Sequence, residues 1–284
     1  MQKEQAKISN ETFPDWFVEK VTEKRKNGNG QKDIMVGGEP FFDFSNPDVG
    51  ILLLHGFSST PAQFIEFGEY LSSEGISYYA PLIAGHGTKP HDLAKSTIDD
   101  WHQSIEQAFN KLAEHVDKVF VLGTSVGGNF AFYLAQKFPD RISGIISVST
   151  PRKIKWQWLF KLRLYTYGWF KGHYTKPSRF YTIDYIDLHD EVTYPIIPCS
   201  ALRRMFYYFR VLTPKHLAAT TVPTLIIQAK GDPVISKKSA GYIHRTIKSK
   251  HKQIYMMDGK VHLPTNGRRK EIQNRVVQFI HEGV

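Results

Sequence analysis

Short apolar runs alternate with longer amphipathic stretches along most of this 284-residue chain. Runs without a polar interruption, such as ILLL at residues 51–54, are typical of strands that are buried on both faces of a parallel sheet. We predict strands over seven segments: Phe41–Phe44, Ile51–His55, Ser77–Ala80, Val119–Gly123, Gly144–Val148, Thr224–Ala229 and Gln253–Met257.

Helical patterns fall between these runs. Thr97 and Asp100 stand at the spacing of a capping box, and the apolar stripe that follows comprises Trp101, Ile105, Phe109 and Leu112. A Ser or Thr cap followed by Pro61 predicts a second helix start, and residues 129–138, 239–247 and 271–280 predict three further helices. Alternating strands and helices favour an α/β fold, with a mostly parallel central sheet and helices on both faces.

Two segments break the alternation. Residues 1–40 are polar, and we assign them to an N-terminal extension in which residues 14–24 fit a short helix. Residues 151–217 are aromatic, basic and poor in strand signal, and they separate two predicted strands. We therefore interpret residues 151–217 as a cap (lid) inserted into one catalytic domain, which comprises residues 41–150 and 218–284.

The strand at residues 119–123 leads into the sequence GTSVGG. An abrupt turn from a strand into a helix strains the turn residue, and small neighbours two positions away avoid a collision. Gly123 and Gly127 are those neighbours of Ser125, and Gly128 adds room. The hydroxyl then stands at the carboxyl end of the sheet, beside a helix N-terminus that favours a developing oxyanion. We interpret Ser125 as a nucleophile; the alternative is a helix-start serine with packing glycines.

A serine hydroxyl needs a base, and the base needs an acid that fixes its tautomer. Asp232 follows one late strand, and His262 lies in a loop between the last strand and the last helix. A parallel sheet delivers both loops to the edge where Ser125 stands. The predicted triad is Ser125, His262 and Asp232. Two alternatives remain: Asp232 caps the next helix, or Asp258, four residues before His262, is the acid.

An oxyanion hole requires two hydrogen-bond donors. The backbone N–H of Phe57, just after the strand at residues 51–55, would pair with the N–H of Val126. We interpret His55 as structural, bracing this loop through hydrogen bonds.

The motifs HGF, PLIAGHGT, DDW, GTSVGGNFA and KGDPV, followed by a late His262, resemble the α/β-hydrolase fold and, more narrowly, bacterial carboxylesterases and monoacylglycerol lipases. The resemblance runs from about residue 50 to 150 and from 220 to the end, and the cap does not match by motif. It implies the same triad, Phe57 and Val126 as oxyanion donors, esters with a fatty acyl chain as substrates, and no cofactor or metal. One departure is the loop before the histidine, which is usually SGH and here contains Lys260.

Positive charge is concentrated in the predicted cap. Residues 151–183 contain no Asp or Glu but eight of the cations behind the formal net charge of +10. Ile154, Trp158, Leu162, Tyr165 and Trp169 are spaced as one helical face, with Trp156 and Phe160 opposite, and Leu202, Phe206 and Phe209 mark a second amphipathic element. These aromatics either pack the cap or form a lipid-facing lid whose cations reach an anionic membrane. We expect no nucleic-acid partner, since no recognition module is apparent.

The composition and the segment patterns predict where in the cell the protein lies. One cysteine, Cys199, no apolar run long enough to span a membrane and no secretory signal favour the cytoplasm, with peripheral membrane contact as a further hypothesis. We predict a serine hydrolase that cleaves carboxylic esters through an acyl-enzyme, with monoacylglycerols or similar single-chain lipid esters as substrates. The alternatives are a small-ester carboxylesterase, a thioesterase or acyltransferase on the same fold, and a non-catalytic binding protein.

Overall fold

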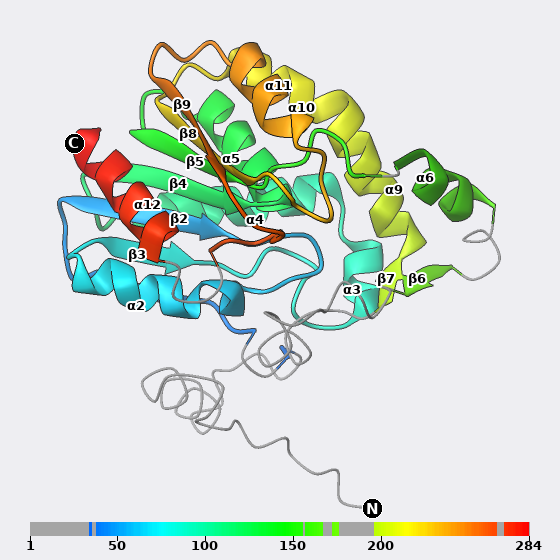
Figure 1. The fold of residues 1–284 in the computed structure, drawn as a ribbon. Coiled ribbons are helices and arrows are strands. Elements are labelled where there is room, and N and C mark those ends of the chain that lie inside the picture. The colour runs from blue at the N-terminus through cyan, green and yellow to red at the C-terminus, as the bar shows by residue number, and fades with distance from the viewer. Residues whose placement is uncertain are drawn as a thin grey trace, which may run out of the picture.

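The computed structural model describes residues 34–35, 38–155, 157–166, 172–175, 196–265 and 270–283. A seven-stranded sheet forms its centre, in the order β1-β3-β2-β4-β5-β8-β9 (Figure 1). Its strands are β1 (Phe41–Asp43), β2 (Val49–Leu54), β3 (Ser77–Ala80), β4 (Lys118–Thr124), β5 (Gly144–Val148), β8 (Thr224–Ala229) and β9 (Lys252–Met257). Only the β1–β3 pair is antiparallel. The predicted strands and the predicted fold class are confirmed.

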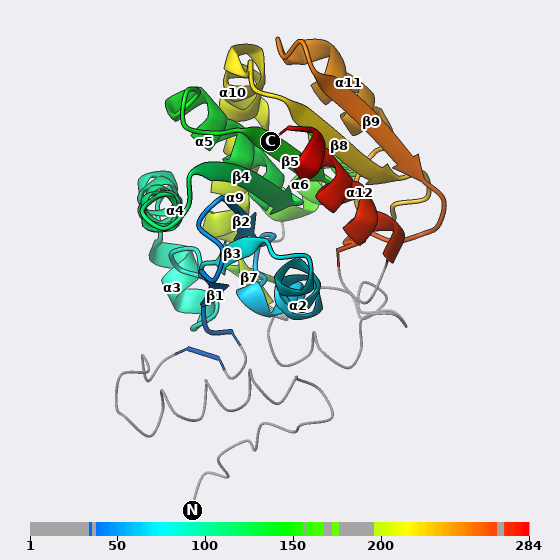
Figure 2. The ribbon, with the colours of Figure 1, turned by 90° about the vertical axis from the view of Figure 1, so that its left-hand side faces the viewer.

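Helices cover both faces of this sheet (Figure 2). On one face lie α2 (Ile65–Ser73) and α12 (Lys270–Glu282); on the other lie α4 (Ile98–Ala113), α5 (Val126–Lys137), α10 (Thr213–Ala219) and α11 (Lys238–Thr246). Side chains of β2 alternate between the two layers, with Ile51 and Leu53 in one core and Leu52 and Leu54 in the other. A strand with both faces buried reads as a continuous apolar run, which is why ILLL predicts it.

The two predicted helix starts agree with the structure to different degrees. Thr97 and Asp100 form the predicted capping box on α4, and the four residues of its apolar stripe are buried. Pro61 does begin a helix, the short 3₁₀ helix η1 (Pro61–Phe64), but no side chain caps it. Thr60 thus occupies the predicted cap position, but its hydroxyl makes no capping hydrogen bond. The N–H of Gln63 donates to the backbone carbonyl of Thr60, so the group that a hydroxyl would have capped is already paired.

The chain between β5 and β8 forms a group of elements beside the sheet (Figure 1). They are α6 (Gln157–Tyr165), the antiparallel pair β6 (His173–Thr175) and β7 (Ile196–Pro198), α9 (Cys199–Tyr207) and a π-helical turn, η3 (Tyr208–Leu212), which leads into α10. Helix α3 (Pro90–Lys95) supports them, because Arg204 and Ser200 on α9 both donate hydrogen bonds to the carbonyl of Ala94. The cap boundaries at 151 and 217 stay a prediction, and the boundary at 217 falls inside α10.

The apolar face predicted for the cap needs one correction. Helix α6 begins at Gln157, so Ile154 is not on it; Ile154 instead forms a β-bridge with Ile235. Backbone pairing with another loop prevails there over helical periodicity. Trp156, Trp169 and the helix expected at residues 14–24 lie outside the described residues, as does the side chain of Phe160. The second element is confirmed, since Leu202, Phe206 and Phe209 are all buried. Within the described ranges, no helix combines the length and apolar character needed to cross a membrane.

Candidate active site

Ser125 occupies the sharp turn between β4 and α5. Its φ of 52° and ψ of −120° are strained for a residue with a side chain. A Cβ atom on Gly123 would lie 2.2 Å from the carbonyl oxygen of Gly127, and one on Gly127 would lie 2.1 Å from that of Leu54. Both positions therefore require glycine, as the spacing predicts. The N–H of Ser125 donates to the carbonyl of Val148 on β5 at 2.8 Å, which ties the turn to the sheet.

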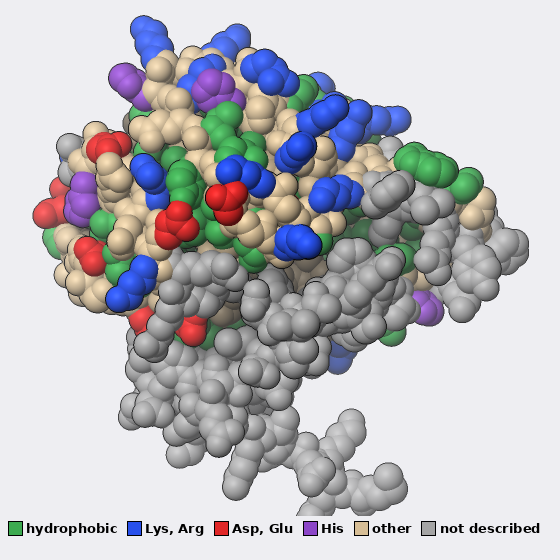
Figure 3. All heavy atoms as spheres, in the orientation of Figure 1, with side chains coloured by type: hydrophobic (Ala, Val, Ile, Leu, Met, Phe, Trp, Pro, Cys, Tyr) green, Lys and Arg blue, Asp and Glu red, His purple; other side chains and the backbone are tan. Residues whose placement is uncertain are grey.

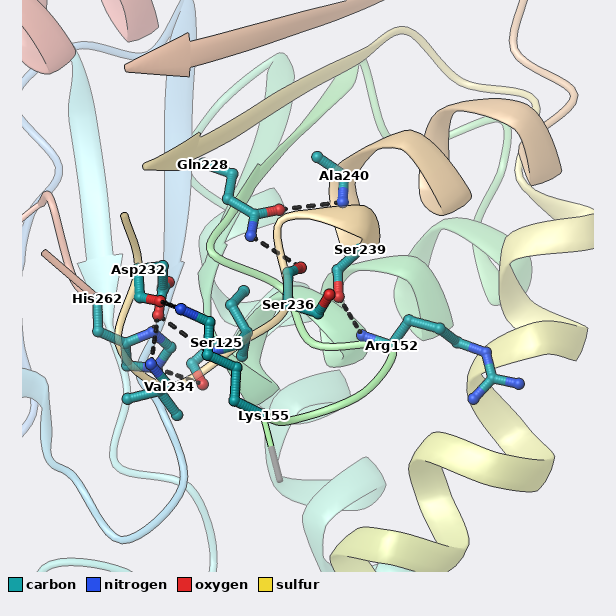
Figure 4. Close-up of polar contacts among 11 residues, drawn as sticks. Ser125, Arg152, Lys155, Gln228, Asp232, Val234, Ser236, Ser239, Ala240 and His262 are labelled. Atoms are coloured by element: carbon teal, nitrogen blue, oxygen red, sulfur yellow. Dashed lines mark hydrogen bonds and ion pairs between the residues drawn. The ribbon is translucent and has the colours of Figure 1, made fainter. Parts of the chain in front are cut away.

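The imidazole of His262 lies between Ser125 and Asp232 (Figure 4). Its Nε2 is 3.2 Å from the Ser125 Oγ, and its Nδ1 is 2.9 Å from the Asp232 Oδ2. A neutral ring with its proton on Nδ1 satisfies both contacts, donating to the carboxylate and accepting from the hydroxyl. The Asp232 side chain is 1% exposed and the His262 side chain 17%. The structure thus brings the three predicted side chains into one hydrogen-bonded chain.

The second oxygen of Asp232 has a different task. Its Oδ1 accepts hydrogen bonds from the N–H groups of Val234 at 2.7 Å and Ile235 at 3.0 Å. The alternative that Asp232 caps the next helix is wrong, because α11 begins only at Lys238; Oδ1 instead closes the turn that follows Asp232, while Oδ2 faces the imidazole. The rival carboxylate, Asp258, is 89% exposed and pairs with Lys230 at 2.8 Å. It does not contact the imidazole.

The two predicted oxyanion donors follow β2 and begin α5. Val126 is the first residue of α5, and the first N–H groups of a helix have no partner within it. A Cβ atom on Gly56 would lie 3.5 Å from the Ser125 Cβ, so the loop that carries Phe57 passes directly beside the nucleophile. The positions of both residues suit an oxyanion hole, and their role as donors stays a prediction.

His55 braces this loop, as its interpretation as a structural residue requires. Its Nδ1 lies 2.9 Å from the carbonyl oxygen of Gly56, and its Nε2 accepts from the N–H of Ile83 at 3.0 Å. Burial, helped by the neighbouring His86, lowers the pKa of His55 to about 3, so the ring is neutral at physiological pH. The Gly56 carbonyl and the Phe57 N–H belong to one planar peptide. Hydrogen bonding at the carbonyl end therefore fixes the direction of the N–H.

Sequence reasoning missed two polar residues at this site. The buried Gln63 accepts from the N–H of Gly56 at 3.3 Å and donates to the hydroxyl of Thr124, which links the Phe57 loop to the nucleophile turn. Lys155 donates to the main-chain carbonyl of Asp232. In the sequence, Gln63 could have been noticed only as an amide within a mostly apolar segment. Nothing in the sequence singles out Lys155.

Among the described residues, no group of three or more His, Cys, Asp or Glu side chains could hold a metal ion. The chemistry available at the site is that of a hydroxyl, an imidazole, a carboxylate and backbone N–H groups.

Comparisons with known proteins agree with this geometry. The chain is 28% identical over 239 residues to a thermostable monoacylglycerol lipase of Bacillus sp. (strain H-257), which covers 83% of this chain and 90% of the relative. It is 24% identical over 245 residues to a carboxylesterase of Bacillus subtilis (strain 168), covering 85% and 96%. Among solved structures, one from work on the metagenome-derived lipolytic enzymes LipS and LipT superimposes with a TM-score of 0.77 at 26% identity, covering 88% of this chain and 99% of that one.

Residues 45–194 match the family model described as "Serine aminopeptidase, S33". This range is more than half of the chain and includes the nucleophile turn. The chain therefore belongs to the serine aminopeptidase S33 family of α/β-hydrolases.

Proposed function

We propose that the protein hydrolyses carboxylic esters through an acyl-enzyme on Ser125. The observation that carries this proposal is the continuous chain from the Ser125 Oγ through His262 to Asp232, with separations of 3.2 and 2.9 Å. Ser125 attacks the ester carbonyl while His262 takes its proton, and the imidazolium then protonates the departing alcohol. Asp232 stabilises the imidazolium, and the N–H groups of Phe57 and Val126 receive the oxyanion. Water activated by His262 releases the acid.

The substrate class follows from the relatives and from the cap. The two curated relatives that cover more than four-fifths of this chain are a monoacylglycerol lipase and a carboxylesterase, whereas a proline iminopeptidase matches only 36% of it. We therefore propose esters over peptides, and among esters those with a single fatty acyl chain. Small-ester, thioester and acyl-transfer activities use the same triad and are distinguished by substrate.

An exposed apolar face on α6 supports a lipid substrate at an interface. Trp158 is 67% exposed, Leu162 55% and Tyr165 57%, whereas Leu164 is buried. The Arg203 guanidinium lies 5.8 Å from the centroid of the Tyr165 ring, but all three side chains, the α6 face, are more than half exposed, which favours the lipid-facing alternative. Figure 3 shows apolar side chains gathered over α6, with Lys and Arg side chains on the adjoining surface. Apolar groups flanked by cations suit an anionic membrane surface, because each cation near it adds about 1 kcal/mol.

A fluorophosphonate probe tests the nucleophile. The wild-type protein should be labelled on Ser125 and should hydrolyse p-nitrophenyl esters, because the neighbouring imidazole activates the hydroxyl. Ser125→Ala should lose both labelling and turnover, while Ser149→Ala, which alters a buried hydroxyl just beyond β5, should keep the label. Labelling of Ser125→Ala at an unchanged rate would disprove the assignment.

Acyl-chain profiling tests the substrate class. Monoacylglycerols and p-nitrophenyl esters of increasing length should give kcat/KM values that rise to medium or long chains. A maximum at acetyl or butyryl esters would indicate a small-ester carboxylesterase. An aminoacyl p-nitroanilide should not be cleaved, and faster cleavage of it than of any ester would reject an esterase.

A further inference from the structure

The acid turn, residues 231–236, presents the Asp232 carboxylate to His262 and is held from the sheet side by Gln228 at the end of β8. The amide nitrogen of Gln228 donates to the carbonyl of Ser236 at 3.1 Å, and its oxygen accepts from the N–H of Ala240 at 3.0 Å (Figure 4). Gln228 is buried. Gln228 thus fixes the far end of the acid turn, where it leads toward α11. The near end is held by main-chain bonds, from the N–H of Gly231 to the Gly259 carbonyl at 3.1 Å and from the N–H of Asp232 to the Ala229 carbonyl at 3.3 Å.

A short segment from the cap side adds a second set of contacts. This segment, the cap root, comprises residues 152–155 and runs antiparallel to the acid turn through the Ile154–Ile235 bridge. The N–H of Lys155 donates to the carbonyl of Val234 at 2.8 Å, and the N–H of Ser236 donates to the carbonyl of Lys153 at 3.3 Å. The start of the cap is therefore paired through its backbone with the loop that carries the acid.

Lys155 bonds the acid turn through two hydrogen bonds. Besides its backbone bond to Val234, its ammonium group donates to the main-chain carbonyl of Asp232 (Figure 4). On the opposite side of the same turn, the Asp232 Oδ1 accepts from two backbone N–H groups, which leaves Oδ2 for His262. The main-chain carbonyl, Oδ1 and Oδ2 of Asp232 therefore each have a different hydrogen-bond partner.

Arg152 fastens the other end of the cap root. One guanidinium nitrogen donates to the carbonyl of Phe209 at 3.3 Å, in the π-helical turn η3, and the group lies 5.1 Å from the centroid of the Tyr242 ring. In Figure 4 its side chain extends away from the triad, opposite to that of Lys155. The cap root therefore joins a cap helix at one end to the acid turn at the other, and α6 begins two residues after it.

We propose that Lys155 is a positioning residue of the triad, which ties the placement of Asp232 to the cap; this inference rests on the proposed function. A charge-assisted hydrogen bond is about twice as strong as a neutral one. Its acceptor is the main chain of the acid itself, so a shift there moves the carboxylate relative to the imidazole. Misplacement by about 1 Å can cost about 100-fold in rate. Because Lys155 donates to the main chain of the acid, its loss should appear in the chemical step.

Three variants isolate this contact. Lys155→Met removes the ammonium group but keeps the backbone bond to Val234, and Lys155→Arg keeps a charged donor. Lys153→Met is the matched control: it lies on the same cap root, its loss of charge is the same, and its exposed side chain makes no hydrogen bond or ion pair with the described residues. Each is assayed with the water-soluble p-nitrophenyl butyrate, so that binding to a lipid surface does not enter.

For Lys155→Met we expect kcat to fall by about tenfold, a loss of about 1.4 kcal/mol, with KM changed less than twofold. The downfield proton NMR resonance of the His262–Asp232 hydrogen bond should shift or broaden, and the melting temperature should stay close to that of the wild type. Lys155→Arg should recover most of kcat, and Lys153→Met should match the wild type in all measurements.

Unchanged kcat and resonance in Lys155→Met would overturn the inference, as would an equal loss in Lys153→Met or a loss confined to KM. These results differ from a failure of the proposed function. In that case the wild-type protein itself would neither label with the fluorophosphonate nor turn over the ester.

Discussion

Ser125 and Trp158 lie in two regions of the molecule that are held in place very differently. The catalytic edge of the sheet is crowded. The backbone around Ser125 touches two other main-chain segments, Gln63 bonds the adjoining loop to Thr124, and His55 links that loop to Ile83. On α6, by contrast, three large side chains are more than half exposed. The edge holds Ser125, His262 and Asp232 in one arrangement, whereas the α6 face is largely exposed. We expect substitutions to follow this difference.

Gly127→Ala should have the largest effect. The added Cβ would lie 2.1 Å from the carbonyl oxygen of Leu54, so β2 and the nucleophile turn must separate. We expect kcat to fall by at least about 100-fold, the cost of roughly 1 Å of misplacement, together with a loss of thermal stability. Steady-state kinetics and calorimetry measure both.

Gly241→Ala is the matched control for this substitution. Its Cβ would meet only the end of the flexible Arg245 side chain, at 3.3 Å, on α11. This variant should keep full activity and gain about 0.5–1 kcal/mol, since alanine is the better helix former. Equal behaviour of the two variants would contradict the idea that the edge is sterically fixed.

Acid should lower the stability of the catalytic edge of the sheet and of the contact between the cap and α4. Burial lowers the pKa of His55 to about 3, and it lowers those of His102 and His216 to about 4. His102 contacts the Tyr208 hydroxyl of η3 at 2.9 Å, and His216 lies on α10. The folded protein therefore binds these protons less readily than the unfolded chain, in which the pKa is about 6.5. Their stabilisation is complete above pH 6.5 and is lost as the pH falls toward 4 and 3.

Urea unfolding between pH 7 and 5 measures this loss. We expect a loss of about 2 kcal/mol by pH 5 for the fully buried His55 and of about 1 kcal/mol each for His102 and His216, which are less deeply buried. His102→Gln combined with His216→Gln should reduce the pH dependence of the unfolding free energy and leave only the contribution of His55. A profile as steep as that of the wild type would show that these two rings do not carry the effect.

Leu162→Gln should have the smallest effect on folding and a clear effect on lipid binding. The side chain is 55% exposed, so the free energy of unfolding should change by less than about 0.5 kcal/mol. Co-sedimentation with phosphatidylglycerol vesicles should fall, and wild-type binding should weaken with salt. Ile254→Gln, at a 38% exposed position on β9, is the control that should bind as the wild type does. Equal wild-type binding to phosphatidylcholine and phosphatidylglycerol would exclude an anionic lipid surface.

The sequence alone predicted the features that arise from local rules. Strands β2, β4 and β8 follow from apolar runs, and the nucleophile turn follows from glycines placed two residues either side of Ser125. Asp232 and His262 could be chosen because each follows a strand of a parallel sheet, which delivers such loops to one edge. These inferences need periodicity, sterics and chain order, and all three can be read along the sequence.

Tertiary structure alone decided the contacts between segments that no local rule relates. Gln63 meets Thr124 across 61 residues, and Lys155 meets Asp232 across 77. It also decided that Ile154 pairs with Ile235 instead of joining α6, and that the α6 face lies open. A side chain's spacing in the chain says which face of a helix it occupies. What covers that face depends on how distant elements pack, and packing is settled only when the whole chain has folded.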